Sequence, residues 1–245
     1  MVNSFNGDTL DKLNLYDIYQ TLLEEYGTQG WWPLFNVNGD EESVGPFYHP
    51  NDYSYPRNRN QKFEIAVGAI LTQNTSWRNA TKALVKLYKK NLLQPVKLER
   101  LKVNKLIDII RSAGFFRRKS KSLKNISKYF LEENPNLNRK KLLNAWGIGK
   151  ETADSILLYA FKKNYFIVDA YTKRIISRLN IVEDAKLDEY ESFRKVIEKN
   201  IPSKTEIYQE YHALFVKHAK KYCRKTPVCR RCVLKEHCQY PNLTK

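Results

Sequence analysis

The chain has 245 residues, and 42% of them are hydrophobic, which is enough to enclose one large core or two smaller ones. Lysine and arginine number 43 against 26 aspartate and glutamate residues, so the formal net charge is +17. This charge favours a nucleic acid or another anionic surface as the partner, although a merely basic surface would give the same count. No apolar run approaches the ~18 residues of a membrane span, and the N-terminus lacks the pattern of a secretory signal. We therefore expect an intracellular protein without a membrane segment.

The N-terminal region combines one predicted helix with a long aromatic loop. Leucines recur at helical spacing over residues 9–26, and Gly27 can end that helix. Residues 28–60 are rich in Gly, Pro, Asn and Asp but also in Trp, Phe and Tyr. Flexible linkers are poor in aromatic residues, so we expect this loop to pack against the core.

Helical spacing resumes after the loop and continues almost to the end of the chain. Residues 165–169 form an apolar stretch of extended character, but this stretch is too short to suggest a sheet. The pattern therefore predicts an all-α fold. The predicted helices cover residues 61–73, 76–91, 102–112, 117–131, 138–145, 150–162, 171–180, 187–199 and 204–221.

A tight turn at Gly147-Ile148-Gly149 separates two of these predicted helices. The glycines permit backbone conformations that a Cβ would forbid. They also let a phosphate approach the N–H groups at the start of the second helix, where the helix dipole favours an anion. The pattern resembles the helix–hairpin–helix motif, which contacts the DNA backbone without reading sequence. We expect contacts to DNA from Gly147, Gly149, Lys150 and Thr152, and an ordinary turn between two helices is the alternative.

A carboxylate follows the apolar segment 165–168. Taken alone, Asp169 is expected to be the N-cap of the predicted helix 171–180. Burial beside a cleft would raise the pKa of this carboxyl group, whereas the nearby Lys173 or Arg174 would lower it.

All four cysteines lie in one basic segment near the C-terminus, with the spacing C-x5-C-x2-C-x5-C. This segment has no hydrophobic periodicity, so something other than an apolar core must fold it. Four thiolates suit either a tetrahedral zinc ion or a [4Fe–4S] cluster. Zinc sites usually show two close pairs, whereas one CxxC is present here, which favours iron–sulfur. The expected ligands are Cys223, Cys229, Cys232 and Cys238.

The hairpin GIGKETAD (147–154), the segment VDAYTKRI (168–175) and the four-cysteine loop together resemble the endonuclease III-like DNA glycosylase superfamily. This resemblance extends over about residues 61–238. It implies a two-lobed, all-α helix–hairpin–helix glycosylase fold with a DNA-binding cleft and a C-terminal iron–sulfur loop. The first cysteine gap departs from the family, because five residues separate Cys223 from Cys229 and the family has six.

The resemblance also implies a division of the chain into four segments. The N-terminal helix and aromatic loop (1–62) are expected to join the C-terminal lobe. Residues 63–168 would form the helical barrel lobe with the hairpin, and residues 169–222 the C-terminal helical lobe. The cluster loop would then occupy residues 223–238.

In this superfamily the aspartate at the position of Asp169 is catalytic, because it stabilises the cationic sugar or orients the attacking water. Endonuclease III carries a nucleophilic lysine where this chain has Glu151. Lys150 is adjacent, but one residue along a helix rotates a side chain by about 100°. We therefore expect a monofunctional glycosylase in which water attacks the sugar. Glu151 either positions that water or merely favours the helix N-terminus.

Two other functions stay open at this point. A bifunctional glycosylase/lyase would use Lys150 or another lysine as its nucleophile. A non-catalytic helix–hairpin–helix protein would bind DNA without releasing a base.

A glycosylase must flip its target nucleotide out of the stack, so side chains have to fill the gap in the duplex. The resemblance places Gln73 at a position that inserts into the duplex and Phe115 at a wedge position. Arg117 and Lys119 would then contact phosphates. The alternatives are core packing for Phe115 and a solvated helix face for the basic run.

The segments WWPLF (31–35), FEIAVGAILTQNT (63–75) and GIGKETADSILLYA (147–160) are similar to the 3-methyladenine DNA glycosylase III group. In that group, aromatic residues at the positions of Trp31, Trp32 and Phe63 line the base pocket. Aromatic faces suit a damaged purine, especially a cationic alkylated ring.

The pair of Glu151 and Asp169 also resembles archaeal uracil DNA glycosylases, so uracil stays open as the target. Trp31 and Trp32 would alternatively only anchor the loop to the core. The expected partner is double-stranded DNA with a damaged base, bound by a monomer.

Overall fold

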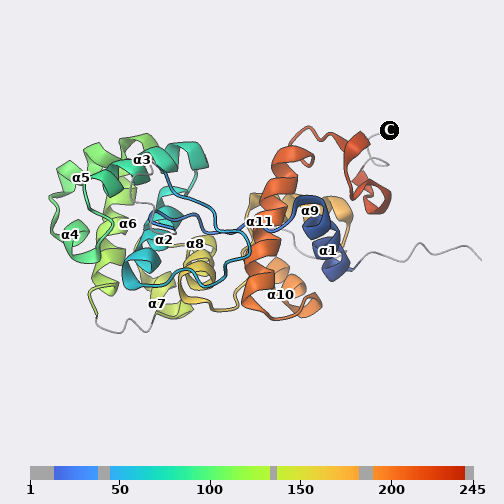
Figure 1. The fold of residues 1–245 in the computed structure, drawn as a ribbon, viewed down its shortest axis with the longest axis horizontal. Helices are drawn as coiled ribbons and strands as arrows, with labels where there is room; N and C mark the ends of the chain where they lie inside the picture. Colours follow the sequence, from blue (N-terminus) through green and yellow to red (C-terminus); the bar gives the residue numbers. More distant parts are fainter. Residues whose placement is uncertain (1–13, 38–44, 133–136, 182–189, 241–245) are drawn as a thin grey trace, which may run out of the picture.

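The computed structural model describes residues 14–37, 45–132, 137–181 and 190–240. Figure 1 shows two helical lobes side by side, with helices α2 to α8 in one lobe and α1, α9, α10 and α11 in the other. Within the described residues, the β-structure consists of one isolated bridge between Leu34 and Phe47. The predicted two-lobed, all-α fold is therefore confirmed. No helix in these described ranges has the length and apolar character to cross a membrane.

The first lobe is built around a central buried helix. Residues 63–71 of α2 are all buried, which is the pattern of a helix surrounded by other elements. Its neighbours are α3, α6, α8 and the π-helical turn η2. The elements of this lobe are α2 (Arg59–Leu71), α3 (Trp77–Lys89), α4 (Pro95–Arg100), α5 (Val103–Ile110), η1 (Arg111–Ala113), α6 (Phe116–Tyr129), α7 (Arg139–Asn144), α8 (Lys150–Ser155) and η2 (Ile156–Ala160).

The second lobe brings the two ends of the described chain together. Its longest helix, α11, packs against α1 and α9 and also contacts η2 of the first lobe. The hydroxyl of Tyr211 on α11 donates a hydrogen bond to the backbone oxygen of Leu15 on α1, at 2.7 Å. The elements of this lobe are α1 (Leu15–Tyr26), α9 (Ala170–Leu179), α10 (Tyr190–Asn200), α11 (Thr205–Lys221), η3 (Cys229–Arg231) and η4 (Lys235–His237).

The chain between α1 and α2 runs from the second lobe to the first, and a buried carboxylate holds it at each end (Figure 1). In the second lobe, Glu210 accepts hydrogen bonds from the backbone N–H groups of Gln29 and Gly30, at 2.6 and 3.2 Å. In the first lobe, Glu64 accepts one from the N–H of Phe35 at 2.8 Å. Burial raises the pKa of Glu64 to about 8. The described parts of the aromatic loop, residues 28–37 and 45–60, therefore pack against the helices, as the sequence indicated.

The predicted helices agree with the observed ones to within about three residues at most ends where both are described. The hydrophobic period misses α4, because six residues are too few to show a helical repeat. The prediction of one helix over residues 102–112 is also refined, since the chain tightens into η1 after Ile110. Residues 9–13 and 187–189 of the predicted helices lie outside the described part of the chain.

Candidate active site

Asp169 lies where the extended segment 165–168 enters helix α9, and both of its carboxylate oxygens meet a nitrogen. One oxygen, Oδ1, accepts a hydrogen bond from the N–H of Thr172 at 2.7 Å, so Asp169 is the N-cap of α9. The other, Oδ2, lies 3.6 Å from Nε2 of His212 on α11. Only 13% of the Asp169 side chain is exposed.

These neighbours decide the charge of Asp169. Burial raises the pKa of the carboxyl group, but the imidazole of His212 and the polar groups of Thr172 outweigh it. The net pKa is therefore below the ordinary aspartate value. A carboxylate that stays ionised in a mostly buried position can stabilise a positive charge that develops beside it.

Glu151, in the first turn of α8, is the second carboxyl group of the site. Removal from water raises its pKa, and the negative charge of Asp169 raises it further. The charges of His212 and Lys173 partly oppose this effect. The pKa values of Glu151 and Asp169 thus move in opposite directions. Two carboxyl groups arranged in this way can take different chemical roles, one as a fixed anion and one as a proton carrier.

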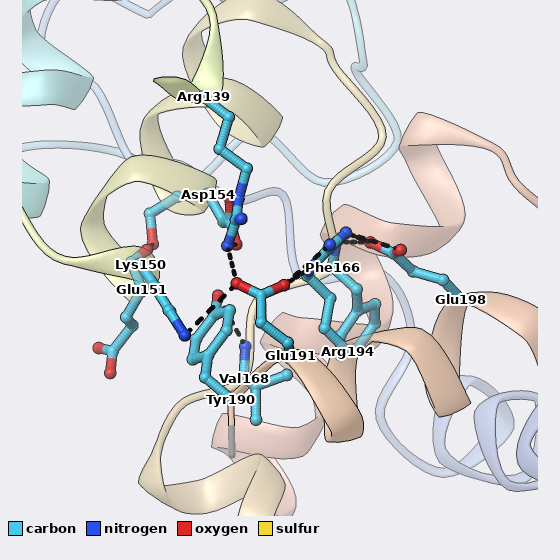
Figure 2. A network of polar contacts seen from close by, with 11 residues as sticks. Arg139, Lys150, Glu151, Asp154, Phe166, Val168, Tyr190, Glu191, Arg194 and Glu198 are labelled. Carbon is cyan, nitrogen blue, oxygen red and sulfur yellow. Dashed lines mark hydrogen bonds and ion pairs between the residues drawn. The ribbon is translucent and has the colours of Figure 1, made fainter. Parts of the chain in front are cut away.

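Lys150 and Glu151 are adjacent on α8 but point in different directions (Figure 2). The Lys150 Nζ atom lies 3.6 Å from Glu191 Oε1 on α10, and 49% of the lysine side chain is exposed. Glu151 points away from this ion pair. The divergence follows from the rotation of about 100° per helical residue.

A buried ion network joins the hairpin helices to α10 (Figure 2). Asp154 on α8 is fully buried and accepts hydrogen bonds from Arg139 on α7, the shorter at 2.7 Å. Burial raises the pKa of Asp154, and the Arg139 guanidinium opposes that rise. The same guanidinium donates to Glu191 Oε1 at 2.7 Å. Arg139 therefore bridges a buried carboxylate of the hairpin and a carboxylate of the second lobe.

Helix α10 also fixes the backbone that leads into Asp169 (Figure 2). Glu198 Oε1 accepts a hydrogen bond from the N–H of Phe166 at 2.8 Å, and the Tyr190 hydroxyl accepts one from the N–H of Val168 at 3.4 Å. Arg194 pairs with Glu198 at 2.8 Å and holds its carboxylate in place. The segment 165–168 thus obtains from side chains the hydrogen bonds that a β-sheet would otherwise supply.

Trp31 lies close to the two carboxyl groups. Its ring packs edge-on against His212, with centroids 5.6 Å apart, and lies 6.4 Å from the ring of Tyr48. A groove of about 400 Å³ beside Trp31 is lined by Tyr48 and, from α11, by Lys217 and Lys220. Burial lowers the pKa of Lys220, and the charge of Asp169 partly offsets this effect. The groove is thus connected to the carboxylate site through the contact of Trp31 with His212, and its volume is of the size that small-molecule pockets have.

The other two predicted pocket residues lie in the core. Trp32 is 6% exposed and packs edge-on against Trp77 and Tyr159. Phe63 is fully buried in α2 and packs against Phe130, with centroids 5.3 Å apart. The expectation that Phe63 lines the base pocket finds no support, because the first lobe encloses its ring on all sides.

The hairpin turn has the features that a phosphate contact requires. Gly147 has a φ of +80°, and a Cβ at this position would lie 2.1 Å from Ser122 Oγ. Gly149 caps α8 without a side-chain hydrogen bond to the first N–H groups of the helix. Gln73 Nε2 donates to the backbone oxygen of Gly147 and to Thr152 Oγ1, at 3.0 and 2.9 Å. Gln73 and Thr152 therefore bind each other beside the turn.

The structure corrects the expected role of Lys119. Its side chain is 2% exposed, and its Nζ donates to the backbone oxygens of Leu71 and Ala113 at 2.8 and 2.7 Å. Burial lowers the pKa of this lysine to about 8. Lys119 faces inward because it lies on the buried side of α6, so it cannot reach a phosphate. It instead ties the end of α2, near Gln73, to the turn that carries Phe115.

The neighbouring side chains of this region are exposed. Phe115 has 59% of its surface exposed and a left-handed backbone conformation with φ +43°. Arg117, two residues after the wedge position, is also exposed. Trp146, just before the hairpin glycines, is 39% exposed, and Lys121 Nζ lies 4.2 Å from its ring centroid.

The sequence reasoning missed His212, Tyr159 and Arg139. His212 on α11 and Tyr159 in η2 are buried residues with polar groups. The one available signal was a polar residue on the buried face of each predicted helix. That signal is weak, because the sequence does not say which partner such a residue meets.

The four cysteines surround one apolar cavity and none of them forms a disulfide. Arg178 Nη1 lies 3.2 Å from Cys223 Sγ and donates to the backbone oxygen of Arg224, and Arg178 Nη2 donates to that of Lys225. His218 Nε2 lies 3.5 Å from Cys232 Sγ. Across the ranges that the structure describes, no three His, Cys, Asp or Glu side chains converge closely enough to hold a single metal ion. The four thiols therefore line one common cavity.

Comparisons with known sequences agree with this geometry. Residues 67–203 match the family described as HhH-GPD superfamily base excision DNA repair protein. A Methanocaldococcus jannaschii protein classed as a DNA repair glycosylase is 43% identical over 237 residues, which cover 91% of this chain and 95% of that protein. Endonuclease III of Thermotoga maritima is 28% identical, with 76% of this chain and 87% of that enzyme covered.

Solved structures share the fold. A trapped covalent intermediate of endonuclease III with DNA superimposes with a TM-score of 0.66 and 22% identity, over 74% of this chain and 85% of that chain. The 3-methyladenine DNA glycosylase of H. pylori bound to 1,N6-ethenoadenine gives 0.65 and 22%, over 85% and 98%. A thermostable thymine-DNA glycosylase gives 0.66 and 18%, over 94% and 97%.

The positions of Arg117 and Lys119 give a first prediction about DNA binding. Replacing Arg117 with Ala is expected to remove one phosphate contact and to reduce the slope of log Kobs against log salt concentration by about 0.9. Lys119→Met removes the same charge from a buried position, so it is expected to lower the melting temperature and leave the slope unchanged. Fluorescence anisotropy on duplex DNA at several salt concentrations measures both variants. A smaller slope for Lys119→Met would show that this lysine reaches the DNA.

Proposed function

We propose that this chain, which belongs to the HhH-GPD superfamily of base excision DNA repair proteins and is a DNA glycosylase, releases its target base by hydrolysis alone. The observation that carries the proposal is the pair of carboxyl groups with opposite pKa shifts at Asp169 and Glu151. The adjacent Lys150 pairs with Glu191 instead. A nucleophilic lysine is therefore replaced by a group that can accept a proton from water.

In the proposed reaction, the bond between the sugar and the base breaks, and its electron pair leaves with the base. The ionised Asp169 stabilises the positive charge that develops on the sugar. A water molecule then adds to the sugar carbon, and Glu151 accepts its proton. The products are the free base and an abasic site in an intact strand.

The proposed base pocket is the groove beside Trp31 and Tyr48. Its aromatic walls can stack on a flipped base, which supports a damaged purine as one candidate. Lys217 and Lys220 line the same groove, and their charge opposes binding of a cationic alkylated ring. Ammonium groups instead favour a neutral base with carbonyl oxygens. Uracil is therefore the candidate that the charge of the groove favours.

We also propose that double-stranded DNA binds across the hairpin and the neighbouring turn. Backbone N–H groups at Gly149 and Lys150 would hold a phosphate at the start of α8. Phe115, which is exposed, is the candidate for the side chain that wedges between bases. Gln73, which lies beside the hairpin, is the second candidate for insertion into the duplex. Arg117 supplies a further phosphate contact.

The four cysteines are proposed to hold a [4Fe–4S] cluster through Cys223, Cys229, Cys232 and Cys238. The common cavity that they surround and the spacing with one CxxC pair instead of two support a cluster rather than zinc. Such a cluster would cross-link a segment that has little core of its own. Arg178 and His218 lie where they can donate hydrogen bonds to the cysteine sulfurs.

A base-release panel tests the proposed reaction. The purified enzyme is incubated with duplexes that contain uracil, 3-methyladenine, 7-methylguanine, hypoxanthine or 8-oxoguanine, and the free base is measured by chromatography. Release of uracil is expected to be fastest, and the strand is expected to remain intact until the abasic site is cleaved by alkali.

Borohydride distinguishes the two reaction types in the same samples. No covalent enzyme–DNA adduct is expected, because water rather than an amine attacks the sugar. Endonuclease III serves as the positive control for trapping. A trapped adduct would contradict hydrolysis alone, and release of none of the five bases would contradict the proposed pocket.

The cysteine cavity gives a separate prediction. Protein purified without oxygen is expected to be brown and to contain iron and acid-labile sulfide in about equal amounts. Cys229→Ser is expected to lose the colour and to unfold at a lower temperature, while Ser177→Ala on the surface of α9 leaves both unchanged. Colourless wild-type protein with one zinc ion per chain would contradict the cluster.

A further inference from the structure

His212 on α11 lies between Asp169 and a second buried polar group. Its Nε2 atom is 3.6 Å from Asp169 Oδ2, and its Nδ1 atom is 2.8 Å from the hydroxyl of Tyr159 in η2. His212 is 5% exposed and Tyr159 is 1% exposed, so water has little access to either side chain. The ring of Trp31 packs edge-on against one side of the His212 imidazole.

The positions of the hydrogens on the Tyr159 hydroxyl and the His212 imidazole can be assigned by elimination. If the Tyr159 hydroxyl donates to Nδ1, the neutral ring carries its hydrogen on Nε2, facing Asp169. If the hydroxyl instead donates to the Gln209 backbone oxygen, 3.1 Å away, its own oxygen accepts from Nδ1–H. A bare Nε2 lone pair turned toward a carboxylate would be repulsive, so this arrangement also calls for a hydrogen on Nε2. Nε2 carries a hydrogen in both favourable arrangements.

We propose that His212 is a positioning residue for base release: its Nε2–H group holds the Asp169 carboxylate in place and keeps it negatively charged, while Tyr159 fixes the imidazole ring. This inference rests on the proposed hydrolysis and adds a residue outside the hairpin and the two carboxyl groups. His212 acts through Asp169 and does not itself contact the sugar.

The other charged groups near Asp169 cannot replace this contact. Glu151 from α8 has the wrong sign, because its negative charge disfavours a second anion. Lys173 from α9 acts on Glu151. Lys220 from α11 lines the groove and interacts with the charge of Asp169, but among the described residues it forms no ion pair with this carboxylate. Thr172 holds only Oδ1. His212 is therefore the group that lies against Oδ2.

Three variants separate the parts of this proposal. His212→Leu removes both hydrogen-bonding nitrogens, His212→Gln keeps an N–H donor that cannot become charged, and Tyr159→Phe removes the hydroxyl that orients the ring. The single-turnover rate of base release is measured from pH 4 to 9, roughly the range over which carboxylates and histidines titrate. The carboxyl carbon of Asp169 is titrated in parallel by NMR and assigned through its loss in Asp169→Asn.

Asp169 must be ionised to act, and the imidazole favours the ionised form. Removing the imidazole therefore raises the pKa of Asp169, and the acid limb of the rate profile moves to higher pH. His212→Leu is expected to lose about 10- to 100-fold in rate at neutral pH, as expected when a buried charged group loses a close polar contact. His212→Gln is expected to recover most of that loss but to keep the shifted acid limb. Tyr159→Phe is expected to fall between wild type and His212→Leu.

Affinity for abasic-site DNA is expected to stay within about twofold of wild type in all three variants, which a general loss of structure would not allow. A rate profile and an Asp169 titration of His212→Leu that superimpose on those of wild type would overturn the proposal, and so would unchanged profiles in both His212→Gln and Tyr159→Phe. If His212→Leu does not fold, His212→Gln and Tyr159→Phe decide the question. Failure of the proposed function is recognised separately, because wild type would then release no base, whereas the NMR titration still shows whether His212 controls Asp169.

Discussion

The structure depends on the cost of burying one carboxylate. Asp169 is mostly removed from water, and an ionised group in such a position must be paired or hydrogen-bonded. The chain meets this requirement from two directions, with the N–H of Thr172 at the start of α9 and the imidazole of His212 on α11. Tyr159 of the first lobe in turn holds His212. The contacts of a single side chain thus bring together the helices that form the site.

The surrounding ion network applies the same principle to the backbone. The segment before Asp169 has no strand beside it, so Glu198 and Tyr190 of α10 satisfy its N–H groups. Arg139 connects α10 to Asp154 on the hairpin helix. The hairpin helix α8 and the backbone that leads into Asp169 are therefore joined by one continuous set of polar contacts. This arrangement explains why buried charged residues, which are costly on their own, occur near the site.

Much of the fold follows from local sequence signals. Helical periodicity predicts most helices, the two hairpin glycines mark the turn, and Asp169 carries the signal of an N-cap. The spacing of the cysteines identifies their segment as a unit. These features are local, because each depends on residues that are close together in the sequence.

The errors concern which side of a helix faces inward and which distant residue it meets. Lys119 belongs to a basic run that reads as a solvated face, yet tertiary packing turns it toward Leu71 and Ala113. Phe63 has the residue type of a pocket wall, but α2 is buried on all sides. The contact between His212 and Asp169 joins positions 43 residues apart, and no periodicity reports such a pairing.

The rate of base release by Asp169→Asn tests the account most directly. Asparagine is as good an N-cap as aspartate, so α9 is preserved while the negative charge is removed. On the DNA substrate that wild type processes fastest, the single-turnover rate is expected to fall by about 100- to 1,000-fold. DNA affinity and melting temperature are expected to stay close to those of wild type. A rate for Asp169→Asn within tenfold of wild type, roughly 1.4 kcal/mol, would contradict the central role of this carboxylate.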